Sequence, residues 1–138
     1  MSISEPRKFL SAIAVIVLTL VIPSCGGGSG GSPSAPRIVD LKVDPELVCV
    51  GSKATISFTL MDANNDEIVW VATVSSSVHG GLEPATGSVS AGTRVFTEFD
   101  AATSGRHNHT EGIHIEAADT TGLKADPVDS SLFVFNCT

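Results

Sequence analysis

The sequence predicts an all-β fold, an antiparallel Greek-key β-sandwich of about seven strands, over residues 37–138. Three observations support this prediction. Apolar and polar residues alternate in several short runs, as they do in strands that bury one face. Clusters of Gly, Asp, Asn and Pro interrupt these runs about every 8–15 residues and mark turns. No run in this region shows the helical period of about 3.6 residues.

The first expected strands are bounded by turn residues. The first strand covers 38–43 and ends at Asp44-Pro45, because proline cannot donate to a sheet ladder. Residues 47–50 form a short continuation that stops at Gly51-Ser52. These breaks predict a strand that is interrupted rather than continuous.

The two clearest runs, Lys53–Met61 and Glu67–Val74, flank a turn at residues 62–66. In both runs every second residue is apolar, which predicts one buried and one exposed face. The inward-facing residues of the two strands are Ala54, Ile56, Phe58, Leu60, Ile68, Trp70, Ala72 and Val74.

The second half of the region contains shorter runs between loops. Residues 75–83 include Gly80-Gly81 and predict a loop, and residues 100–110 predict a second, polar loop. The remaining apolar runs predict strands at 87–90, 94–99, 112–118 and 131–136.

Residues 1–24 predict a signal peptide. Arg7 and Lys8 supply the positive charge that precedes an apolar run at 9–22. As a helix, these 14 residues would be about 21 Å long. The apolar core of a bilayer is about 30 Å thick, so the run is too short for a stable membrane-spanning helix.

The segment Ile22-Pro23-Ser24-Cys25 resembles the lipobox of bacterial lipoproteins. The resemblance implies that the chain is cut before Cys25 and that its thiol carries a diacylglycerol group, whose acyl chains anchor the protein to a membrane. Residues 25–36 would then form a flexible Gly/Ser/Pro tether. Because Gly26 replaces the Asp that retains such proteins in an inner membrane, we expect the outer membrane where the host has one. The alternative is a secreted protein whose Cys25 carries no lipid.

Residues 37–138 resemble the immunoglobulin-like and PKD-like extracellular domains of bacteria. The resemblance rests on the run 48–56, the Asp/Asn-rich turn at 62–66, the Asp-x-x-Gly turn at 119–122 and the position of Trp70 on a long strand. It implies a single immunoglobulin-like sandwich. The chain differs from antibody domains, because it has no Tyr and no Cys pair on the second and sixth strands.

Cys49 and Cys137 remain as a pair once Cys25 is assigned to the leader junction. In an exported protein we expect these two thiols to form a disulfide, which would join the last strand to the first half of the domain. In the chain-entropy model, closing such a loop stabilises the fold by about 4–5 kcal/mol. The alternative is two unpaired thiols.

Asp62, Asn64 and Asp66 have the spacing of oxygen ligands in a calcium loop. The Gly and the distal Glu of an EF-hand are missing, but Glu67 or Asp119 could complete a site at the sheet edge. Asp and Asn are also common in turns that bind no metal, because their side chains cap their own backbone. Both interpretations stay open at the level of sequence.

His107 and His109, with His114 nearby, are candidate ligands of a transition metal. We expect the first two to lie in a polar loop and the third to face outward on a strand. No Cys or carboxylate pattern completes a tetrahedral metal set around them. Nor does a Gly-x-Ser-x-Gly motif provide a nucleophile, so we expect no enzyme activity.

The chain is acidic, with 8 Lys and Arg against 15 Asp and Glu. This balance, without a basic stripe, argues against binding to nucleic acid. The sequence therefore predicts a lipid-anchored protein of the cell envelope, whose non-catalytic sandwich binds a protein or an envelope polymer or acts as a structural module. The alternative is an exported domain that binds calcium or another metal ion through the Asp62, Asn64 and Asp66 turn, or through His107 and His109.

Overall fold

A computed structural model describes residues 32–103 and 108–137 of the chain, so the predicted signal peptide, Cys25 and His107 lie outside the described residues. The described residues form nine β-strands and no helix. Within these ranges, then, nothing helical is long and apolar enough to cross a bilayer.

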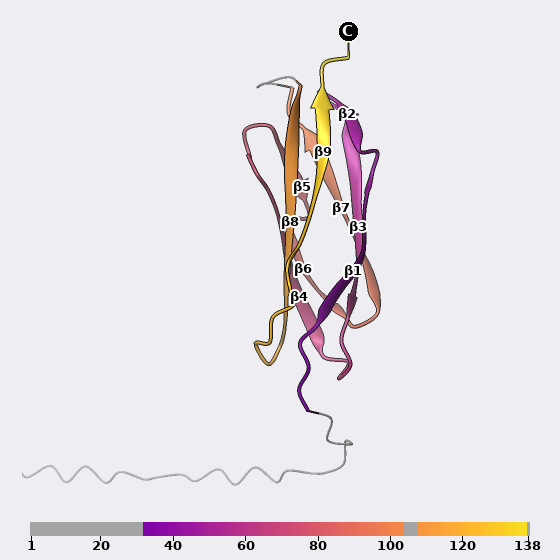
Figure 1. Cartoon of the computed structure of the whole chain (residues 1–138), viewed down its shortest axis with the longest axis vertical. Helices are drawn as coiled ribbons and strands as arrows, with labels where there is room; N and C mark the ends of the chain where they lie inside the picture. Colours follow the sequence, from indigo (N-terminus) through magenta and orange to yellow (C-terminus); the bar gives the residue numbers. More distant parts are fainter. Residues whose placement is uncertain (1–31, 104–107, 138) are drawn as a thin grey trace, which may run out of the picture. The chain divides into compact units, whose positions relative to one another are not determined.

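Two sheets form a β-sandwich (Figure 1). Among the described residues, sheet A has four strands in the order β1-β3-β7-β5, and sheet B has five in the order β2-β9-β8-β4-β6. In chain order the strands are β1 (Arg37–Asp44), β2 (Leu47–Cys49), β3 (Lys53–Met61), β4 (Glu67–Val74), β5 (Gly80–Glu83), β6 (Thr86–Ser90), β7 (Thr93–Ala101), β8 (His109–Asp119) and β9 (Val128–Phe135).

The predicted fold class is confirmed, and β3 and β4 have the predicted bounds. The strand number was underestimated, because residues 75–83 are not all loop: Gly80–Glu83 form β5, which pairs with β7. A Cβ atom on Gly80 would lie 2.5 Å from the carbonyl oxygen of Asp100. The glycine therefore permits close approach of the two strands, whereas in the sequence it looks like a loop signal.

The second correction concerns the pairing of the strands. The sequence predicted residues 47–50 as a continuation of the first strand, but β2 is a separate strand that pairs with β9, with Val48 opposite Val134. This pair is parallel, an exception to the predicted antiparallel arrangement among the described strands. The polar loop predicted at 100–110 is also shorter, because β7 ends at Ala101 and β8 begins at His109.

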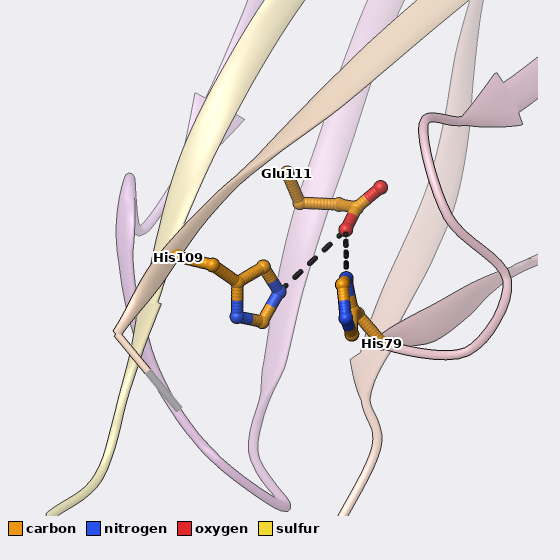
Figure 2. A group of neighbouring side chains, drawn as sticks. All are labelled: His79, His109 and Glu111. Carbon is orange, nitrogen blue, oxygen red and sulfur yellow. Dashed lines mark ion pairs between the residues drawn. The ribbon is translucent and has the colours of Figure 1, made fainter. Parts of the chain in front are cut away.

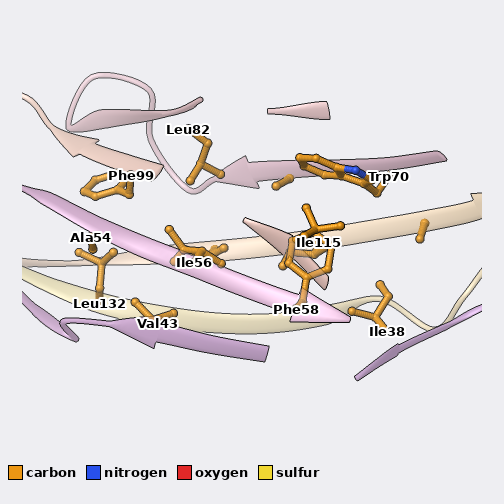
Figure 3. Packing of buried hydrophobic residues seen from close by; sticks show 14 of the residues in the cluster. Ile38, Val43, Ala54, Ile56, Phe58, Trp70, Leu82, Phe99, Ile115 and Leu132 are labelled. Atoms are coloured by element: carbon orange, nitrogen blue, oxygen red, sulfur yellow. The ribbon is translucent and has the colours of Figure 1, made fainter. Parts of the chain in front are cut away.

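The apolar faces of the two sheets meet in one core (Figure 3). Every residue predicted to face inward from β3 is buried, and so are those of β4 except the half-buried Val74. β7 and β8 add further inward-facing side chains, the largest of which are Phe99, Ile113 and Ile115. The middles of the strands are therefore occupied by the apolar core, and polar side chains can form a site only at the strand ends.

β8 is a long strand that extends from one end of the sandwich to the other (Figure 1). Its first residue, His109, pairs with Val134 near the end of β9, where a disulfide joins Cys49 to Cys137. Its last residue, Asp119, lies at the other end, where β1 begins. We call these the disulfide end and the β1-start end.

Candidate metal centres

Three carboxylates meet at the β1-start end: Asp62, Asp66 and Asp119. Each offers one ligand atom, and these atoms lie within 4.8 Å of one another. Asp62 and Asp66 flank the turn between β3 and β4, and Asp119 ends β8. They come together because β8 pairs with β4 so that Asp119 lies opposite Ile68.

The turns fix two of these carboxylates through one oxygen each. Asp62 Oδ1 accepts the N–H of Asn64 at 2.6 Å. Asp119 Oδ1 accepts the N–H and hydroxyl of Thr121 at 2.8 and 2.7 Å, and the N–H of Leu123 at 2.9 Å. Burial of Asp119 acts to raise the pKa of its carboxyl, but these hydrogen bonds outweigh burial and lower that pKa below its usual value.

The second oxygen of each turn carboxylate is left without a partner. Asp62 and Asp119 are 8% and 5% exposed, and the Oδ2 atom of each is buried and accepts no hydrogen bond. Among the described residues, no Lys or Arg nitrogen lies within 4.0 Å of these carboxylates. Buried oxygens with no donor are costly, and a bound cation would offset that cost.

Of the residues that the sequence suggested here, the structure brings together Asp62, Asp66 and Asp119. Asn64 is exposed and contributes its backbone N–H to the turn. The Glu67 carboxylate is also exposed and accepts a hydrogen bond from the hydroxyl of Ser88. Asp119, rather than Glu67, is therefore the residue whose carboxylate completes the cluster with Asp62 and Asp66.

A second cluster lies at the disulfide end and consists of His79, His109 and Glu111 (Figure 2). His79 ends the segment between β4 and β5, and the other two are the first and third residues of β8. Glu111 Oε2 lies 3.4 Å from His79 Nδ1 and 3.6 Å from His109 Nε2. The two imidazole rings are tilted against each other, with centroids 4.1 Å apart.

The carboxylate of Glu111 is completely buried, and its other oxygen is held in place. Oε1 accepts the hydroxyl of Ser75 at 2.6 Å and the N–H of Ser76 at 2.7 Å. The same Ser75 hydroxyl oxygen accepts the N–H of Gly112 at 3.0 Å. These bonds point Oε2 at the two histidines, as Figure 2 shows.

The sequence indicated one member of this second cluster, because His109 was a candidate metal ligand together with His107, but it did not indicate His79 or Glu111. His79 is 30 residues before His109, in a segment for which the sequence predicts only a loop, and Glu111 precedes the predicted start of its strand. The one available signal was the alternation of His109, Glu111 and Ile113, which places a carboxylate on the inward face of a strand. His114 is elsewhere, on the outer face, where its Nδ1 lies 2.6 Å from Asp129 Oδ1.

An apolar groove of about 230 Å³ lies on the outer face of sheet B. Val69 and Val71 of β4 and Ala118 of β8 line it, and Lys124 and Pro127 border it. On the opposite sheet, Phe96 projects outward and is 59% exposed. Both sheets therefore present apolar side chains to solvent.

No protein-family model matches this chain, and no curated protein sequence matches it. Solved structures share its fold at low identity. The PKD domain of an M14-like peptidase from a Thermoplasmatales archaeon is 15% identical with a TM-score of 0.60, and the match covers 76% of this chain and all of that domain.

Two further structures are similar. WR4, an MSP family member of Caenorhabditis elegans, is 14% identical over 70% of this chain and 97% of its own, with a TM-score of 0.53. The periplasmic chaperone SfaE is 11% identical over 75% of this chain, with a TM-score of 0.56, and the match spans 57% of the chaperone. These similarities show an immunoglobulin-like or PKD-like sandwich.

Proposed function

We propose that the chain is a lipid-anchored envelope protein whose sandwich is a binding or structural module without catalytic activity. The observation that carries the proposal is the order of its parts. An apolar run ends at Cys25, a Gly/Ser tract follows, and the sandwich begins at Arg37. Two or three acyl chains hold a protein firmly to a membrane, and a flexible tract lets the attached domain move clear of the surface.

Metabolic labelling with an alkyne analogue of palmitate tests the anchor. We expect the label on the full-length protein in the membrane fraction, and its loss in a Cys25→Ala variant. The double variant Cys49→Ser/Cys137→Ser is the matched control, because it removes the other two cysteines and should keep the label. An unlabelled wild-type protein, or one whose label follows Cys49 and Cys137, would contradict the proposal.

The binding role is tested separately, with a photo-crosslinking residue in place of Val69 on sheet B or Phe96 on sheet A. Both side chains are exposed on the outer faces of their sheets. A reproducible cross-linked species at one position but not the other, formed in intact cells, supports a partner-binding face. The absence of such a species at both positions overturns the binding role and leaves the structural one.

Calcium binding at Asp62, Asp66 and Asp119 is the second candidate function. The unpartnered Oδ2 atoms of Asp62 and Asp119 favour it, because calcium prefers carboxylate oxygens as ligands. Extracellular calcium modules bind with Kd values of about 10⁻⁴–10⁻³ M. About 10 mM Ca²⁺ should then stabilise the fold by about 1.4–2.7 kcal/mol.

Thermal unfolding in about 10 mM Ca²⁺, which is about tenfold or more above the expected Kd, compared with unfolding in EDTA, tests this candidate. We expect calcium to raise the midpoint by several degrees, and Asp66→Asn to abolish the rise. Asp126→Asn removes an exposed carboxylate outside the cluster and should leave the rise intact. Equal midpoints in calcium and EDTA would remove this function without affecting the anchor.

A further inference from the structure

We propose that His79, His109 and Glu111 form a binding site for a divalent transition metal ion of the zinc class. The inference is independent of both the lipid anchor and the calcium site. It starts from the donor set, because two imidazole nitrogens and one carboxylate oxygen are the ligands of known three-residue zinc sites. In this chain they come from a loop and a strand that lie far apart in sequence.

The distances within the cluster fit ligands of one ion. Zinc–nitrogen bonds are about 2.0–2.1 Å long, so two ligands at the tetrahedral angle lie roughly 3.4 Å apart. Glu111 Oε2 is 3.4 Å from His79 Nδ1 and 3.6 Å from His109 Nε2. A direct N–H···O hydrogen bond would place the same atoms about 2.7–3.2 Å apart. The spacing therefore matches a shared metal ion better than a hydrogen-bonded pair.

The unpartnered polar atoms lead to the same conclusion. Glu111 Oε2 and both ring nitrogens of His109 are buried and have no hydrogen-bond partner among the described residues. An ion bound between Oε2 and Nε2 would satisfy two of these three atoms at once. Without an ion, a fully buried carboxylate oxygen faces two imidazoles that do not donate to it within hydrogen-bond distance.

The surroundings of Glu111 orient it as a ligand. Ser75 and Ser76 occupy Oε1, so only Oε2 is free to bind an ion. Supporting hydrogen bonds of this kind fix the orientation of metal ligands. The side chains of His79 and His109 are 20% and 15% exposed, so the site lies close to the solvent. The described residues supply three ligands, and in a tetrahedral site of this kind the fourth position is open to a further ligand such as water.

The ligand chemistry separates this site from the carboxylate cluster at the β1-start end. Imidazole nitrogen suits zinc, copper, nickel and iron, whereas an all-carboxylate set suits calcium and magnesium. Zinc should bind at the disulfide end and calcium at the other end, and neither should displace the other.

Titration of the purified protein with ZnCl₂ by calorimetry tests the proposal. We expect one high-affinity site per chain, a zinc-dependent rise in the thermal midpoint, and reversal of that rise by EDTA. His79→Gln should weaken zinc binding at least about 10-fold, since removal of even a supporting residue has an effect of about 10–100-fold. Because His79 is part of a loop and is partly exposed, this variant should fold, which circular dichroism checks.

Binding of Co²⁺ gives a second readout, a visible spectrum, which would not appear if these residues had only a structural role. Visible ligand-field bands of four-coordinate cobalt should appear in the wild type and disappear in His109→Gln. His114→Gln removes an imidazole outside the cluster and should keep both the bands and the zinc affinity. The proposal would be overturned if the wild type bound no zinc, or if His79→Gln and His109→Gln bound zinc as tightly as the wild type. Loss of zinc binding in His114→Gln would also overturn it.

Discussion

Phe58 and Trp70 meet edge to face across the two sheets, with ring centroids 5.4 Å apart and an angle of 80° between their planes. Phe58 comes from β3 in sheet A and Trp70 from β4 in sheet B, so the pair joins the two layers of the sandwich. Trp70 is the only tryptophan of the chain. Its fluorescence therefore reports on the packing between the sheets.

Replacing Phe58 with Leu should lower the free energy of unfolding by about 1–3 kcal/mol, because it removes an aromatic contact and leaves a small cavity. Urea unfolding followed by Trp70 fluorescence measures the change. Phe96→Leu is the matched control, since Phe96 is exposed on the same sheet, and its effect should stay within about 0.5 kcal/mol. Equal losses in both variants would show that the core contact has no special weight.

Gly87→Ala should destabilise the fold by about 1–3 kcal/mol. A Cβ atom on Gly87 would lie 2.9 Å from Trp70 Nε1, so the indole would have to move within a packed core. Gly81→Ala tests the same change where the Cβ would meet nothing within 4 Å. We expect Gly81→Ala to be neutral or slightly stabilising, and chemical denaturation of both variants distinguishes the two outcomes.

Reduction of the Cys49–Cys137 disulfide should lower stability by about 2–5 kcal/mol. The bond spans 88 residues and closes the end at which the three residues of β2 pair with β9. Denaturant midpoints with and without a reducing agent measure the loss. The Cys49→Ser/Cys137→Ser variant should show the reduced value in both conditions, and an effect of the reductant on this variant would point to a cause other than the disulfide.

The His114–Asp129 pair should make stability depend on pH. The hydrogen bond to Asp129 raises the pKa of His114, with a smaller contribution from the Asp129 charge, and these effects exceed the opposing effect of desolvation. A histidine with a raised folded-state pKa stabilises the fold fully below its unfolded pKa of about 6.5, and the contribution is lost as the pH rises through the folded value.

We therefore expect the free energy of unfolding to fall above about pH 6.5, by no more than about 1 kcal/mol because the pair is exposed. Asp129→Asn should flatten this part of the pH profile when unfolding is measured at closely spaced pH values. An unchanged profile in that variant would assign the pH dependence to other groups.

The alternating pattern was sufficient to predict the fold class and the strands with one buried face, as the bounds of β3 and β4 show. It was not sufficient for β5. Gly80 lies so close to Phe99 and Asp100 that no side chain fits there, and the local sequence does not show this tertiary contact. The parallel pairing of β2 with β9 was missed for a related reason, since three residues carry no signal about the direction of their partner.

The two metal clusters were predictable to different degrees. Asp62 and Asp66 share one turn, so local spacing suggests them, whereas Asp119 was one of two alternatives, with Glu67, for a further ligand. His79 and Glu111 come together only through the pairing of distant strands and the path of a loop. A contact of this kind depends on tertiary register, which single-sequence patterns do not contain.

The direction of β8 gives the molecule a chemical polarity. The strand has 11 residues, so its first and last residues are separated by roughly 33 Å at 3.3 Å per residue. Imidazole nitrogens lie at one tip and the three Asp carboxylates at the other, where Met61, next to Asp62, pairs with the first residue of β1. Molecules immobilised on a sensor surface through residues preceding Arg37 would display the imidazoles to the flowing buffer, whereas attachment through the C-terminus would reverse the display.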